Sequence, residues 1–74
     1  METAIQIGTY RHYSGKAYKV IGIGKHSETL EDMVIYEALY DNQLSKIWIR
    51  PVAMFTEIVP WPDGNSRPRF EFIG

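Results

Sequence analysis

Turn signals interrupt this chain about every eight to twelve residues, and this spacing constrains the fold more than any other feature. The segments between the turns are rich in branched side chains, which suit a pleated sheet and lose rotamer freedom on a helix. Isoleucine, valine and threonine together number 17, against 7 for alanine and leucine. The pattern therefore predicts an all-β protein, built as a small antiparallel barrel or sandwich.

The expected strands are short. They cover residues 9–13, 17–25, 33–40, 46–50, 56–59 and 69–73. Gly22 and Gly24 predict a bulge or bend within the second strand. A helical turn is expected within 26–32, and a tight turn at 52–55 could carry Phe55 into the core. Because closure of the sheet hides its edges, the predicted fold is an SH3-like barrel of five to six strands with one short helical turn, forming a single domain over residues 1–74.

Alternation along the strands assigns side chains to faces, since successive residues of a strand point to opposite sides. Within 46–50, Ile47 and Ile49 are expected to face the core. Trp48 and Arg50 then lie on the other face, where these residue types are typical of binding sites. In the alternative interpretation, Trp48 packs against the chain ends. Within 33–40 the set expected to point inward is Val34, Tyr36, Ala38 and Tyr40.

The charge of the chain is small but unevenly distributed. A net charge of −1 gives no overall attraction to nucleic acid. Residues 10–26 nevertheless contain four basic side chains and no acid, whereas residues 28–41 contain five acids and no base. Ion pairs between neighbouring strands would explain this division. A surface with two faces of opposite charge is the alternative.

Composition also narrows the chemistry and the compartment. The chain has no cysteine, which excludes disulfides, Cys-rich zinc sites and Cys nucleophiles. Its two histidines cannot by themselves complete a tetrahedral zinc site, so neither a metal nor another cofactor is expected. No apolar run approaches the roughly 20 residues that span a bilayer, and the first residues lack the pattern of a signal peptide. We therefore expect a cytoplasmic protein that does not bind membranes.

Polar and aromatic side chains that a core does not need mark a candidate ligand-binding surface. An arginine could hold a carboxylate or phosphate through two hydrogen bonds, and an indole offers a stacking face. A histidine beside a carboxylate could act as a general base near neutral pH. The candidate site residues are Tyr10, Arg11, His12, His26, Glu28, Trp48 and Arg50.

Several stretches also give the chain a family likeness. They are residues 8–15, 26–29, 34–40, 48–55 and 68–70. With these residues in this order, the chain resembles a bacterial family defined only as domain of unknown function 1653. The resemblance implies a small, stand-alone, cytoplasmic bacterial domain, and it brings no established activity, substrate or catalytic residue. The sequence departs from the family pattern in a longer region at 61–64.

The leading functional hypothesis is a non-catalytic binding module for an anionic small molecule or a peptide carboxylate. One alternative is a small hydrolase that uses His26 or His12 together with Glu28 or Glu57. Another is a weak single-stranded nucleic-acid binder, which the net charge disfavours. A protein partner or a homodimer is compatible with so thin a core, because a small domain gains stability from a partner surface.

Overall fold

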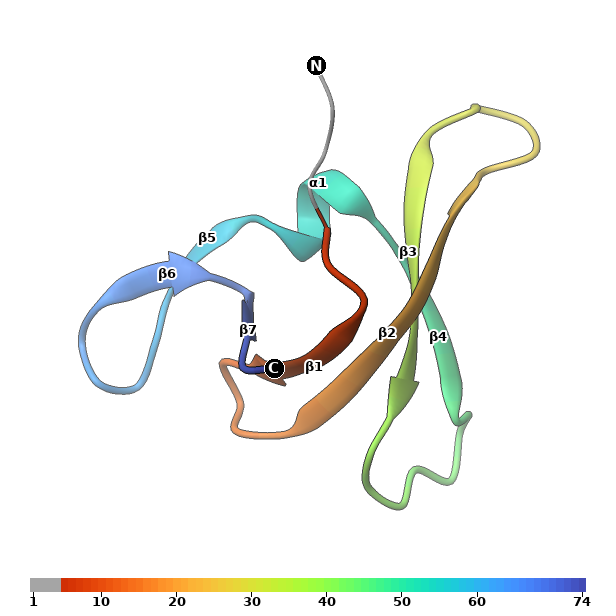
Figure 1. Cartoon of the computed structure of the whole chain (residues 1–74). Coiled ribbons are helices and arrows are strands. Elements are labelled where there is room, and N and C mark those ends of the chain that lie inside the picture. The colour runs from red at the N-terminus through yellow and green to blue at the C-terminus, as the bar shows by residue number, and fades with distance from the viewer. Residues whose placement is uncertain (1–4) are drawn as a thin grey trace.

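The computed structural model describes residues 5–74, which form seven strands and one helix. The strands are β1 (Gly8–His12), β2 (Ala17–Lys25), β3 (Asp32–Ala38), β4 (Ile47–Pro51), β5 (Ile58–Pro60), β6 (Ser66–Pro68) and β7 (Phe70–Phe72), and the helix is α1 (Val52–Phe55). Five strands form one sheet in the order β4-β3-β2-β1-β7, and β5 pairs with β6 in a separate hairpin (Figure 1). Every pair is antiparallel, which confirms the predicted all-β fold.

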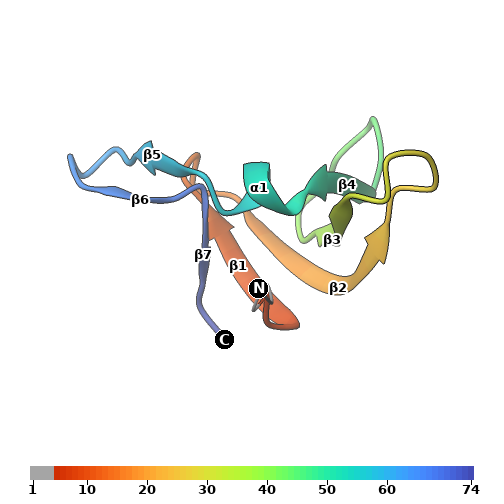
Figure 2. The same cartoon turned by 90° about the horizontal axis from the view of Figure 1, so that it is seen from above.

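The main sheet bends at the glycines of β2. The register between β2 and β3 shifts between Val20 and Gly22, so Ile21 is the extra residue of a β-bulge, as the glycines predicted. β2 is long and bowed, and the sheet curls from β4 round to β7 (Figure 2). β4 and β7 are its two end strands and are not hydrogen-bonded to each other. Residues 5–74 thus form no closed barrel, and the predicted SH3-like barrel is not confirmed.

The core lies on the inner face of this curled sheet, under α1. Phe55 is 1% exposed, and its ring stacks on that of Phe70 with centroids 4.1 Å apart and an interplanar angle of 2°. The prediction that 52–55 turns Phe55 into the core is therefore confirmed. No helix within the described range 5–74 has the length and apolar character needed to cross a membrane. The buried core cluster is Tyr10, Val20, Val34, Tyr36, Val52, Phe55 and Phe70.

The faces of β3 were predicted correctly and those of β4 were not. Trp48 lies opposite the buried Tyr36 and packs against the core, and Arg50 shares its face. Ile47 and Ile49 point outward and are 45% and 62% exposed. The physical reason is size, because a half-buried indole covers more apolar surface than an isoleucine side chain. The other face of β4 therefore carries the exposed isoleucines.

The turn predicted within 26–32 is a single hydrogen-bonded turn that does not continue into a helix, since the N–H of Leu30 donates to the carbonyl of His26 at 2.8 Å. Nδ1 of His26 accepts the backbone N–H groups of Glu28 and Thr29 at 3.1 and 3.3 Å. Leu30 then takes a left-handed conformation with φ of 63°. The imidazole thus satisfies backbone donors as a capping side chain would.

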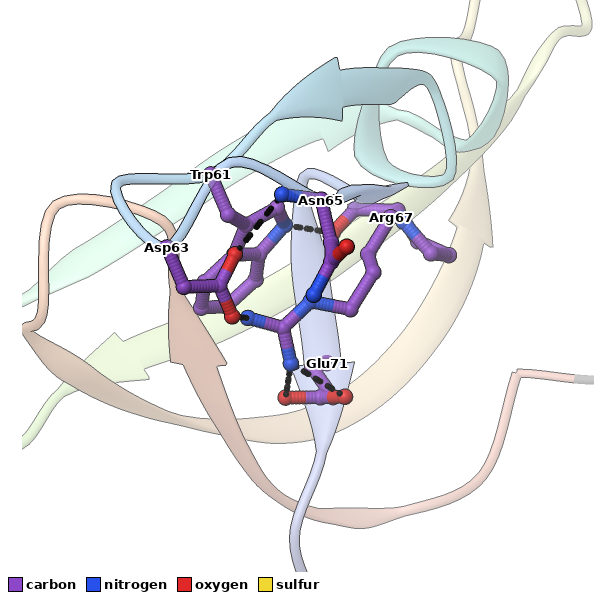
Figure 3. Close-up of polar contacts among 6 residues, drawn as sticks. Trp61, Asp63, Asn65, Arg67 and Glu71 are labelled. Carbon is purple, nitrogen blue, oxygen red and sulfur yellow. Dashed lines mark hydrogen bonds and ion pairs between the residues drawn. The ribbon is translucent and has the colours of Figure 1, made fainter.

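A network around Arg67 joins the β5–β6 hairpin to the main sheet (Figure 3). The guanidinium lies 4.1 Å above the ring of Trp61. It donates to Glu71 of β7 at 3.0 and 3.1 Å, and to Asp63 in the hairpin turn at 2.7 Å. Asp63 also accepts the backbone N–H of Asn65 at 3.0 Å. The two carboxylates and the indole hold both terminal nitrogens and the face of this guanidinium, and only its buried Nε is without a partner among residues 5–74.

Candidate functional site

Aromatic rings surround one guanidinium on the inner face of the main sheet. Tyr36 lies at the centre, with its ring 5.2 Å from that of Tyr18 and 5.3 Å from that of Phe70, both in edge-to-face contact. Each strand of the sheet contributes one side chain. The inner-face cluster consists of His12 from β1, Tyr18 from β2, Tyr36 from β3, Arg50 from β4 and Phe70 from β7. Strand pairing therefore brings together residues that are far apart in the sequence.

The guanidinium of Arg50 is half-buried and has no carboxylate partner. Its Nε donates to the hydroxyl of Tyr36 at 3.3 Å, and its central carbon lies 5.7 Å from the centroid of Phe70. Within residues 5–74 every salt bridge is made by other side chains. A partly buried charge is normally paired, so this guanidinium is open to an incoming anion.

The arginines of the C-terminal strands provide a contrast. Arg67 is held between Asp63 and Glu71, and Arg69 donates to Glu57 at 2.8 Å. The hydrogen bond to Glu57 is the main cause that raises the pKa of Arg69. Both side chains are thus paired with carboxylates within the fold, whereas Arg50 is not.

The lowered pKa of His12 reflects its burial and the positive charge around it. Its ring lies 4.7 Å from Phe70, and burial lowers the pKa of its imidazole, with further lowering from the charges of Arg50 and Arg69. Its Nδ1 accepts the backbone N–H of Ser14 at 3.2 Å, so the neutral ring carries its proton on Nε2. His12 is therefore a neutral donor at physiological pH.

Two tyrosines close one end of the cluster. The hydroxyls of Tyr18 and Tyr40 are hydrogen-bonded to each other, and Asn42 donates to Tyr40 at 3.3 Å. Burial raises the pKa of Tyr18, and the hydrogen bond to Tyr40 raises it further. The Tyr18 hydroxyl therefore stays neutral and adds a polar group without negative charge. The described residues hold no group of three acidic or histidine side chains that could bind a metal ion.

Three of the seven sequence-predicted site residues lie in the inner-face cluster or beside it. His12 and Arg50 belong to the inner-face cluster, and Trp48 lies two residues before Arg50 on the same face of β4. Trp48 is half-buried against the core, and its Nε1 donates to the carbonyl of Ser45 at 3.0 Å. Trp48 is thus packed, as in the alternative interpretation, but its neighbours belong to the core.

The other four lie outside the inner-face cluster, although Tyr10 shares the inner face of the sheet. Tyr10 is buried in the core and is hydrogen-bonded through its hydroxyl to the backbone of Gln6. Arg11 is exposed and alternates with His12, so it points to the opposite face of β1. His26 and Glu28 lie in the exposed turn between β2 and β3. The structure does not bring these four residues to the inner-face cluster.

Comparison with protein families then places the chain. The family model described as "Protein of unknown function (DUF1653)" matches residues 8–72, which include every strand and the helix. The chain belongs to the DUF1653 family. The resemblance noted in the sequence is thereby confirmed, and the inner-face cluster lies wholly within the DUF1653 domain.

A solved DUF1653 structure has a similar fold. The crystal structure of a DUF1653 protein from Bordetella bronchiseptica matches with a TM-score of 0.87 and 33% sequence identity, over 95% of this chain and 88% of that one. Among curated proteins, the comparison found no match.

Sequence reasoning missed three members of the cluster in this DUF1653 domain, namely Tyr18, Tyr36 and Phe70. One signal was available, since alternation placed Tyr36 on the inward face. The position of Arg50 beside it depends on the register between β3 and β4, which pairs Tyr36 with Trp48. The aromatic fraction of 14% indicated that the chain is rich in rings, but it could not indicate which rings contact one another in the fold.

Proposed function

We propose that this DUF1653 domain is a non-catalytic module that binds an anionic group at Arg50, within the inner-face cluster. The observation that carries the proposal is the half-buried guanidinium with no carboxylate partner among residues 5–74. A guanidinium presents paired N–H donors that match a carboxylate or phosphate, and aromatic walls strengthen the attraction by excluding water. The ligand class is thus an anionic small molecule or a peptide carboxylate.

Two neighbours support the same ligand class. Arg69 adds positive charge near His12, and the ring of His12 carries a proton on Nε2 that could be donated to an oxygen atom. A bound anion would be attracted by the same two positive charges that lower the pKa of His12. The site therefore gains electrostatic energy from a negative charge and none from a positive one.

The hydrolase alternative needs a histidine beside a carboxylate. Among residues 5–74, neither His12 nor His26 makes such a contact. The Oγ of Ser14 lies 2.8 Å from Nδ1 of His12, but the same Nδ1 accepts the Ser14 backbone N–H, so this contact closes a turn. No observation favours the hydrolase over the binding module. The nucleic-acid alternative stays a prediction.

We also propose that the bent sheet is an SH3-like barrel left open between β4 and β7, with the inner-face cluster near that opening. Support comes from the strand order β4-β3-β2-β1-β7 and from α1 directly after β4. Bacterial origin, a cytoplasmic location and homodimer formation stay predictions.

The binding proposal is tested by NMR titration of the protein with succinate and with inorganic phosphate at low salt. Saturable shifts are expected at the inner-face cluster, and Arg50→Gln should weaken binding about tenfold or more, because a charge-assisted hydrogen bond is lost. Arg11→Gln removes the same charge from the opposite face and should leave binding unchanged. Equal effects of the two substitutions, or no saturable binding of either anion, would overturn the proposal.

A further inference from the structure

The open edge of β4 follows from its pairing with β3. The N–H of Ala38 donates to the carbonyl of Lys46 at 2.8 Å, so this pair is hydrogen-bonded. In an antiparallel ladder such pairs alternate with pairs that do not exchange hydrogen bonds. With the observed register, the backbone groups of Ile47, Ile49 and Pro51 therefore point away from β3. These three positions form the free edge of the sheet.

Two of the three positions cannot exchange both backbone hydrogen bonds with an added strand. The Oγ of Ser45 donates to the carbonyl of Ile47 at 2.7 Å and accepts its N–H at 3.2 Å. Pro51 has no N–H to donate. Within residues 5–74 no hydrogen bond engages the outward N–H and carbonyl of Ile49. The edge thus offers one residue whose donor and acceptor are both available.

The two faces of β4 at Ile49 differ in chemical character. The side chain of Ile49 is 62% exposed on the outer face, where it lines a groove of about 290 Å³ together with Met33, Ile35 and residues 24–27. Gly24 leaves the groove open because it has no side chain. On the inner face, the next residue is Arg50 with its unpaired guanidinium. The edge is therefore apolar on one side and cationic on the other.

We propose that the edge of β4 at Ile49 binds an extended peptide in which an acidic residue adjoins an apolar one. This inference rests on the proposed function and names its ligand class. The peptide residue that pairs with Ile49 would exchange two backbone hydrogen bonds with it and place an apolar side chain against Ile49, at the rim of the groove. The adjacent peptide residue would face the inner side opposite Arg50, where cross-strand side chains lie about 4.5–5.5 Å apart at Cβ. An Asp or Glu at that place would pair with the guanidinium.

A peptide fits this edge better than the other occupants. A free anion could satisfy Arg50 but would leave the backbone of Ile49 and the apolar groove uncovered. A second copy of the chain could pair its β4 with this one, but residues Ile47–Pro51 contain no acid to offer to Arg50. Charge complementarity thus favours an acidic partner strand.

The probe is a synthetic peptide with blocked ends, acetyl-Thr-Val-Glu-Val-Glu-Val-Thr-amide, which has no terminal carboxylate. Its control carries N-methyl groups on all three valines, which removes the donors facing β4 and keeps the charge. Titration followed by NMR should show the unmodified peptide binding about tenfold or more tighter than both the control and succinate. The amide proton of Ile49 should shift as it becomes hydrogen-bonded.

The outcomes separate the two proposals. Equal affinity of the unmodified and N-methylated peptides, or of peptide and succinate, overturns strand addition, and the proposed function still stands if Arg50→Gln weakens succinate binding. If Arg50→Gln changes the affinity of neither ligand, both proposals fail. A dimer seen by sedimentation that the peptide does not dissociate would overturn strand addition in favour of a second copy at this edge.

Discussion

At the scale of single residues, the protonation of His12 should couple stability to pH. Its pKa in the fold lies below the ordinary value of 6.5, because burial and the charges of Arg50 and Arg69 oppose its protonation. The unfolded chain therefore binds this proton more readily than the fold. The stabilising contribution of neutral His12 is present above the unfolded pKa and is lost as the pH falls through it toward the folded pKa.

We expect the free energy of unfolding to fall as the pH is lowered from about 7.5 to 5.5, and His12→Gln to flatten that dependence. Urea unfolding at a series of pH values measures it. Between about pH 7.5 and 8.5 the two proteins should show parallel curves, since His12 is neutral throughout. An unchanged slope below pH 6.5 in the variant would mean that other groups cause the loss.

Single side chains also show what the sequence can reveal about a site. Arg50 and His12 were recognisable by residue type, because cationic and titratable groups stand out in a mostly apolar pattern. Their companions Tyr18 and Phe70 look like ordinary core residues. What distinguishes them is position across the sheet, which depends on pairings between strands far apart in the chain. The sequence likewise could not predict that Arg50 lacks a carboxylate partner, because this depends on which cation each carboxylate pairs with in the fold.

At the scale of the strands, two glycines should respond oppositely to the same substitution. Gly8 begins β1 with φ of 149°, and a Cβ there would lie 2.8 Å from Cε1 of Phe72. Gly22 has no positive φ and no atom within 4 Å of such a Cβ. We expect Gly8→Ala to cost about 1–3 kcal/mol of stability, and Gly22→Ala to be neutral or stabilising by up to about 1 kcal/mol.

Thermal and urea unfolding of both variants would check this pair. Each serves as control for the other, since the added methyl group is the same. If Gly8→Ala were as stable as the wild type, the ring of Phe72 would have to move aside at little cost. If Gly22→Ala were strongly destabilising, the bulge at Ile21 would need a glycine for a reason other than space.

Ser45 should prevent another strand from pairing with the β4 edge at Ile47. Its hydroxyl occupies both outward backbone groups of Ile47. In an antiparallel pairing of two β4 strands centred on Ile49, Ile47 of one copy would lie opposite Pro51 of the other. Removing the hydroxyl would add hydrogen bonds to that pairing, and uncapped edges promote association. We expect Ser45→Ala to increase self-association, and Ser66→Ala, in the β5–β6 hairpin, to leave it unchanged.

Sedimentation velocity over a range of protein concentrations measures this difference. A Ser45→Ala variant that stays as monodisperse as the wild type at every concentration would show that Ser45 does not prevent association through the β4 edge. Circular dichroism should confirm that both variants keep the β fold, because the hydroxyl is exposed and water can replace it.

The same strand marks the limit of prediction from sequence at this scale. Turns and strand positions were predictable, because glycine, proline and polar clusters punctuate the chain; the end of β2 at Lys25 is one example. The faces of β4 were predicted the wrong way round, because alternation alone cannot say which side faces the core. Ile47 and Ile49 are the more apolar pair, but β4 is an edge strand, and Trp48 covers more of the core from the inner side.

At the scale of the whole molecule, the uneven charge of the chain is resolved by strand pairing. Lys25 in the basic segment pairs with Asp32 in the acidic one at 2.7 Å, across β2 and β3. Glu37 lies opposite Lys19 in the same ladder but pairs with Lys46 at 3.4 Å. The predicted ion pairing between the two segments is therefore confirmed for Lys25 and Asp32. Such exposed pairs contribute about 0–1 kcal/mol each, so they favour the register more than they stabilise the fold.

Stability must therefore come mainly from a small aromatic core, and replacing Phe55 tests this directly. A chain of 74 residues is expected to be stable by roughly 4–11 kcal/mol. Phe55 is fully buried between Phe70 and Tyr10, and replacing a buried Phe by Ala costs about 3–5 kcal/mol. Phe55→Ala should lower the melting temperature by about 12 °C or more, or leave no cooperative transition.

The neighbouring Met54 supplies the matched control, because it lies on the same helix turn and is 48% exposed. Met54→Ala should change stability by about 0.5 kcal/mol or less. If Phe55→Ala melted within a few degrees of Met54→Ala, the stacking of α1 on β7 would not be what holds the core together. Because Phe70 belongs to both the core and the inner-face cluster, Phe55→Ala should also weaken succinate binding in any fraction that stays folded. Intact binding in a folded Phe55→Ala protein would show that the site keeps its shape without the core beneath it.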